Sequence, residues 1–89
     1  MKDYKVIKVS SKSPVPQLSG SIIHSVEDRE DVELRALGAS AVNQMYKAMA
    51  SARGTLAAKG IDLLFKPGFD TISEDGCEKT VMIAHIVID

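Results

Sequence analysis

The sequence lacks the features that mark several common classes of protein. Cys77 is the only cysteine, so no disulfide can form within the chain, and one thiol with two distant histidines gives no zinc-binding spacing. No apolar run reaches the ~18 residues of a membrane-spanning helix. The N-terminal MKDYKVIKVSSK also lacks the apolar region and cleavage site of a signal peptide. We therefore expect a cytoplasmic protein with no membrane association, no metal and no cofactor.

Catalytic signatures and a basic excess are missing as well. The chain contains no GxSxG, P-loop or GxGxxG pattern. We expect His24 at the surface and His85, among apolar neighbours, as a hydrogen-bonded core or interface residue. The net charge is -1, whereas proteins that hold nucleic acid mainly through phosphate contacts usually carry a basic excess. We predict no enzyme activity and no small-molecule substrate, and any nucleic-acid binding must be local or weak.

The composition that is present fits one small globular domain, which we place at residues 1–89. Hydrophobic residues make up 45% of the chain and charged residues 26%, which is ordinary for a folded protein and argues against disorder. A chain of this length should bury roughly 60 to 65% of its unfolded surface around a single core.

The first third of the chain predicts a strand followed by a helix. Residues 4–10, YKVIKVS, alternate apolar and polar side chains, a pattern typical of a half-buried strand. In the following SSKSPVPQ, we expect Ser13 to be the helix N-cap and Pro14 to take the first helical position. The apolar stripe of this helix, which runs to about residue 28, is formed by Val15, Leu18, Ile22 and Val26.

A second strand leads directly into a second helix. Residues 32–38, VELRALG, alternate again until Gly38 breaks the pattern. ALGASAVNQMYKAMASARG, at residues 36–54, predicts a helix in which only Lys47 and Arg53 are charged. Its expected core stripe is Val42, Met45, Met49, Ala52 and Leu56, and its polar side is Ser40, Asn43, Gln44, Lys47, Ser51 and Thr55.

The last third predicts a hairpin. Residues 61–72 indicate a strand interrupted at Pro67 and Gly68 by a bulge or bend near a sheet edge. SEDG at residues 73–76 is a turn, and a long apolar strand follows from residue 80. The order β-α-β-α-β-β, with right-handed crossovers, predicts an α+β two-layer sandwich: a four-stranded mixed sheet with two helices on one face. The uncovered face keeps apolar residues, so we expect a homodimer or higher homo-oligomer to cover it.

Four segments resemble a known family. KVSSKS at residues 8–13, ALGASAVNQMYKAMASARG at 36–54, GIDLLFKPGF at 60–69 and the DG turn followed by EKTVMIAHIV are similar to stage V sporulation protein S. The likeness runs over nearly the whole chain. Its GASAVNQ helix is also similar to a helix of the Alba chromatin proteins. The resemblance implies an Alba-like dimer that regulates spore development, binds DNA or RNA and has no enzyme activity.

Carried over residue by residue, the resemblance implies a nucleic-acid contact in the loop after the first strand. Lys12 would meet a phosphate at the first helix N-terminus, beside Ser13. From the polar side of the second helix we add two further candidates: Lys47 as a second point charge, and Asn43 as a hydrogen-bond donor to backbone or base. Arg53 is the fifth candidate, although its position also suits a contact that ties the helix to its own sheet.

Two departures from the Alba pattern favour a different function. Ser40 and Gln44 stand where that pattern has Arg and Lys. The hairpin FDTISEDGCEKT carries an acidic set against the single Lys79, and an acidic hairpin is repelled by DNA. That set is Asp70, Glu74, Asp75 and Glu78. The alternative prediction is therefore a protein–protein interaction adaptor on the same fold, without nucleic-acid binding.

The uncharged polar side chains between residues 40 and 55 leave three interpretations open. Small polar groups suit a subunit contact, because charged residues are depleted at the centre of interfaces. In a second interpretation, Asn43, Gln44 and Lys47 supply donors to a nucleic acid. A solvated helix face is the third interpretation.

Overall fold

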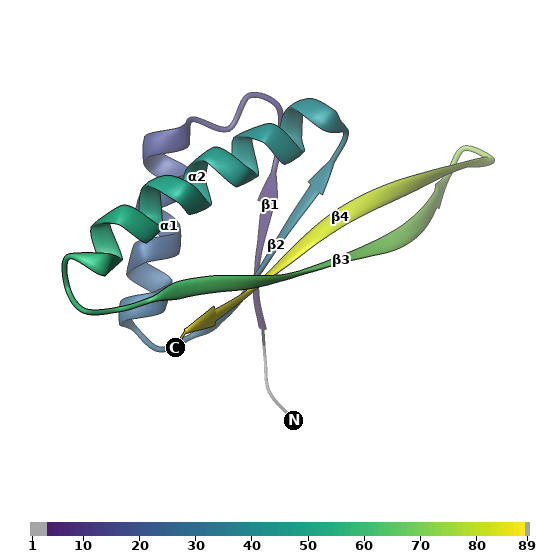
Figure 1. The fold of residues 1–89 in the computed structure, drawn as a ribbon. Coiled ribbons are helices and arrows are strands. Elements are labelled where there is room, and N and C mark those ends of the chain that lie inside the picture. Colours follow the sequence, from purple (N-terminus) through teal and green to yellow (C-terminus); the bar gives the residue numbers. More distant parts are fainter. Residues whose placement is uncertain (1–3, 89) are drawn as a thin grey trace.

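The computed structural model of the protein describes residues 4–88 and contains six regular elements (Figure 1). In chain order they are β1 (Tyr4–Val9), α1 (Val15–Glu27), β2 (Asp31–Leu37), α2 (Ala39–Ala57), β3 (Leu63–Glu74) and β4 (Cys77–Ile88). This is the predicted β-α-β-α-β-β order. Neither helix in the described range is both long and apolar enough to cross a membrane.

The strands form one mixed sheet in the order β1-β2-β4-β3. β1 and β2 are parallel, whereas β4 is antiparallel to both of its neighbours. Both helices cover the same face, and the β3–β4 hairpin projects beyond them (Figure 1). The predicted α+β architecture is therefore confirmed.

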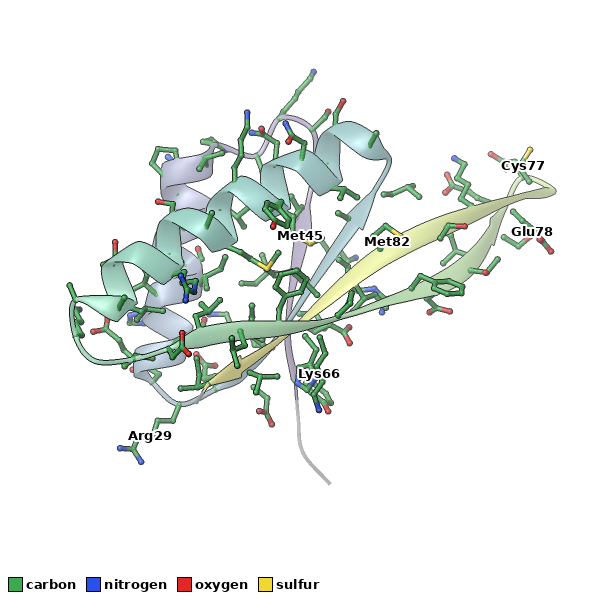
Figure 2. The ribbon with its side chains drawn as sticks, viewed as in Figure 1. Arg29, Met45, Lys66, Cys77, Glu78 and Met82 are labelled. Atoms are coloured by element: carbon green, nitrogen blue, oxygen red, sulfur yellow. The ribbon has the colours of Figure 1, made fainter. Side chains whose placement is uncertain are left out.

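The core lies between the helices and the sheet. Strand β2 supplies Val32, Leu34 and Ala36, whose side chains alternate toward the helices because successive residues of a strand face opposite sides. Helix α1 contributes the predicted stripe, with Val15 only partly buried. Helix α2 buries Ala41, Met45, Ala48, Met49, Ala52 and Leu56. Figure 2 shows Met45 between α2 and the sheet, whereas Val42, predicted in the core stripe, is only partly buried.

The expected cap of the first helix is wrong. Pro14 occupies the N-cap position of α1, and no side chain caps this end. The hydroxyl of Ser13 instead accepts a hydrogen bond from the N–H of Ser10 at 2.9 Å. The chain therefore makes a separate turn before the helix begins, and Ser13 stabilises that turn.

The expected interruption of the third strand is also wrong. β3 pairs with β4 without a break, from Leu63 opposite Ile88 to Glu74 opposite Cys77, and Pro67 lies opposite Ala84 in that register. The predicted edge position is correct, because β3 is the last strand of the sheet. Proline is compatible with an edge strand, where one side of the backbone needs no partner.

Candidate nucleic-acid interface

The loop between β1 and α1 is a compact turn closed by serines. The N–H of Ser13 donates to the carbonyl of Ser10 at 3.1 Å, and the N–H of Lys12 donates to the hydroxyl of Ser10 at 3.2 Å. The side chain of Lys12 is exposed and forms no ion pair with any residue between 4 and 88. The turn thus fixes the backbone of Lys12 and leaves its ammonium group available to a ligand.

Gln44 ties this loop to α2. Its side-chain Nε2 donates to the carbonyl of Ser13 at 2.8 Å, in a partly buried contact between residues 31 positions apart in the chain. This bond holds the loop against the first half of α2, and Figure 1 shows the two segments at the same end of the molecule. Gln44 was predicted as part of an uncharged polar stripe, but the structure gives it an internal partner.

The two helix N-termini differ as donors for an anion. The first turn of a helix normally leaves four N–H groups without an intrahelical partner. In α1, two of these positions are Pro14 and Pro16, which have no N–H group. The expected anion site beside Lys12 therefore rests on fewer donors than a helix N-terminus usually offers.

Helix α2 begins with a full set of donors. No side chain caps it, and its first turn contains no acidic residue that would compete with a phosphate. Gly38, which directly precedes the helix, has a φ of 93°, a backbone conformation that favours glycine. The N–H groups of residues 39–41 follow it. Sequence reasoning missed this end of α2. The glycine before an acid-free helix start was the available signal.

The remaining candidates lie along α2. Asn43 and Lys47 are exposed, and Lys47 has no ion-pair partner within the described range. Arg53 lies about 9 Å further along the helix axis than Lys47. Its Nη2 is 3.4 Å from Oδ1 of Asp62, in an exposed ion pair just before β3. The structure therefore places Lys12, Ser13 and Asn43 beside the first half of α2 and Lys47 at its middle, whereas Arg53 bridges the helix to its own sheet.

The acidic hairpin points away from this region. Its tip, with Cys77 and Glu78, is the far end of the molecule in Figure 2, well separated from the loop after β1. Part of its charge is also engaged, because Asp70 accepts from Arg35 at 3.1 Å and Glu74 lies 3.8 Å from Lys79. The separation reduces the repulsion that the hairpin tip would exert on an anionic ligand bound at Lys12.

These features define an Alba-like protein: a β-α-β-α-β-β chain with both helices on one face and a projecting hairpin. Among solved structures, the chain is similar to Alba from Thermoplasma volcanium, with a TM-score of 0.64 and 11% sequence identity over 96% of this chain and 99% of that chain. That likeness shows the fold. The family model of stage V sporulation protein S (SpoVS) matches residues 5–89, and the chain belongs to this family.

Proposed function

We propose that this chain is a non-enzymatic regulatory protein of the cytoplasm that binds DNA or RNA weakly, as a dimer, through the loop after β1 and α2. The observation that carries the proposal is the hydrogen bond from Gln44 to Ser13, which fixes the loop of Lys12 beside α2. Lys47 lies almost one turn after Gln44 on the same helix. The ammonium group of Lys12 thus lies beside the first half of α2, and that of Lys47 lies at the middle of the same helix.

The same charges account for weak binding. Arg53 is partly neutralised by Asp62, which leaves Lys12 and Lys47 as the free cations among the five candidates. Phosphate contacts are the main source of affinity that does not depend on sequence. On duplex DNA, each contact makes the slope of log K against log salt concentration steeper by about 0.9. Two contacts therefore give a binding constant that depends only weakly on salt, and a modest affinity.

An uncharged surface between α2 and the hairpin supports the dimer. Tyr46 on α2 is 62% exposed and Phe69 on β3 is 71% exposed, and Met82 of β4 is also open to solvent. We use the name α2–hairpin groove for the hollow lined by Val42, Asn43 and Tyr46 from α2 and by Thr80 and Met82 from β4. Phe69 borders it as the β3 partner of Met82. Large exposed apolar side chains on a continuous surface are typical of interaction sites.

The hairpin register strengthens this assignment. Successive residues of a strand face opposite sides, so Phe69 and Met82, which are paired, share the helix side of the hairpin. Asp70, Glu74 and Lys79 fall on the other side, whereas Glu78, near the hairpin tip, falls on the side of Met82. The strand residues that face the groove itself, Thr80 and Met82, are uncharged, as expected at the centre of a subunit contact. This favours the subunit-contact interpretation of the uncharged surface of α2.

Fluorescence anisotropy with single- and double-stranded oligonucleotides at two ionic strengths tests the binding. For the wild type, affinity should fall as the salt concentration rises. Lys12→Ala combined with Lys47→Ala should reduce the slope of log K against log salt concentration, measured with duplex, by about 1.8. The matched control is Lys5→Ala with Lys59→Ala, which removes the same charge from lysines already paired with Glu30 and Glu27. Equal slopes in the two double variants would contradict the proposed site.

Sedimentation of the wild type and of Phe69→Ser tests the dimer. Because Phe69 is so exposed, its replacement should leave the fold intact and shift the protein toward the monomer. Leu64→Ser is the control, since Leu64 is an exposed apolar residue on the opposite face of β3. A monomeric wild type, or equal effects of both substitutions, would refute the groove as the subunit contact.

The acidic hairpin favours a second candidate function, a protein–protein interaction adaptor on the same fold. Between Asp70 and Lys79, four acidic side chains face one lysine, and a single-sign field of this kind discourages nucleic acid near the hairpin. An adaptor would show no salt-dependent binding to DNA or RNA at micromolar protein in the same titrations. The proposed nucleic-acid function fails under that result, whereas the dimer does not depend on it.

A further inference from the structure

The sheet face opposite the helices carries an aromatic pair. Tyr4 of β1 and His85 of β4 reach toward each other across β2, with ring centroids 4.9 Å apart and an edge-to-face angle of 77°. About half of Tyr4 is exposed. Nε2 of His85 is buried and has no hydrogen-bond partner within residues 4–88, contrary to the expected hydrogen-bonded histidine. Leaving a buried nitrogen without a hydrogen-bond partner is costly.

Among the described residues, the charged side chains on this face that lack an ion-pair partner are positive. Lys66 lies opposite His85 in the register of β3, and Figure 2 shows it on the side of the sheet away from the helices. Lys8, on β1, lies opposite Arg35 of β2. Neither lysine forms an ion pair with another described residue.

The carboxylates on this face are already engaged. Arg35 donates to Glu33 at 3.5 Å and to Asp70 at 3.1 Å. Asp31, at the start of β2, also has an interaction partner. Among residues 4–88, an anionic ligand would therefore meet two ammonium groups without an ion-pair partner here, and carboxylates that are already engaged.

A second copy of the chain is a poor occupant of this face. A two-fold contact would bury Lys8 and Lys66, and the described carboxylates on the facing copy's sheet are already engaged.

We propose that the open face of the sheet binds a short single-stranded segment of nucleic acid. A base would stack on the exposed ring of Tyr4, and the flanking phosphates would lie at Lys8 and Lys66. Stacking on an aromatic ring requires an unstacked base, which single strands offer and duplexes do not. The inference rests on the proposed function in that the ligand is a nucleic acid, but it uses different residues on the opposite face.

The test measures anisotropy with a labelled oligo(dT) or oligo(U) of 12 nucleotides and with a duplex of the same length. Tyr4→Leu should weaken single-strand binding at least about fivefold, whereas Tyr4→Phe should bind as the wild type does. Lys8→Ala with Lys66→Ala should lower the salt slope on single strands by about 1.4. The same double variant should leave duplex binding unchanged.

Each outcome separates this inference from the proposed function. If single-strand binding is unchanged in Tyr4→Leu but lost in Lys12→Ala with Lys47→Ala, the inference is overturned and the proposed function stands. The inference is also overturned, and the proposed function kept, if the wild type binds the duplex but not the single strand. Binding to neither oligonucleotide would refute both. A shift from dimer to monomer in sedimentation of Tyr4→Leu would show that a second copy covers this face, which also overturns the inference.

Discussion

The hydrogen bond between Gln44 and Ser13 provides the sharpest prediction for stability. Gln44→Ala removes a 2.8 Å bond and leaves the partly buried carbonyl of Ser13 without its side-chain donor. The net contribution of such a bond is about 0.5 to 1.5 kcal/mol. Alanine is the better helix former by a few tenths of a kcal/mol, which offsets part of the loss. We expect the free energy of unfolding to fall by about 0.5 to 1 kcal/mol.

Urea denaturation followed by far-ultraviolet circular dichroism measures this change, and thermal unfolding should show a Tm lower by roughly 2 to 8 °C. Asn43→Ala is the matched control, because Asn43 is the neighbouring residue of the same helix and is exposed without a hydrogen bond in the described structure. It should be neutral or slightly stabilising. Equal stabilities of the two variants would refute the view that Gln44 fixes the loop.

Two further substitutions test the core with the same denaturation assay. Ser25 is fully buried and its hydroxyl has no partner among residues 4–88, so Ser25→Ala should raise the unfolding free energy by up to about 1 kcal/mol. A marked loss of stability would instead show that the hydroxyl is satisfied. Leu56→Ala should cost about 2 to 5 kcal/mol because Leu56 is fully buried. The exposed Leu64→Ala should cost far less, and a similar cost for both would contradict the described core.

The architecture could be predicted because each strand and helix shows its own local periodicity. The alternation in β2 and the stripe of α1 determine which side chains are buried, and the handedness of the crossovers then puts both helices on one face. Local sequence alone gave the wrong structure at Ser13, predicted as a helix cap, and at Pro67, predicted to interrupt a strand. Ser13 is drawn into a serine turn, and Pro67 is compatible with an unbroken strand because β3 lies at the sheet edge.

The candidate site was less visible in the sequence. Lys12 followed from the resemblance to the family and Lys47 from the polar side of the predicted helix, but the contact that brings their segments together joins residues 31 positions apart. No local pattern reveals such a bond. The ion pair of Arg53 with Asp62 likewise depends on how the end of α2 meets β3. The aromatic pair of Tyr4 and His85 comes from strands at opposite ends of the chain and needs the strand order to be seen.

Pro67 has a consequence for how copies of this protein can meet. A long outermost strand with a regular row of free N–H and C=O groups is a template for sheet extension and aggregation. A paired proline requires that its missing N–H face outward, so the outer row of β3 lacks a donor four residues after Leu63. An incoming strand would find no continuous ladder there. Contacts through side-chain surfaces therefore have the advantage over edge-to-edge pairing on this side of the molecule.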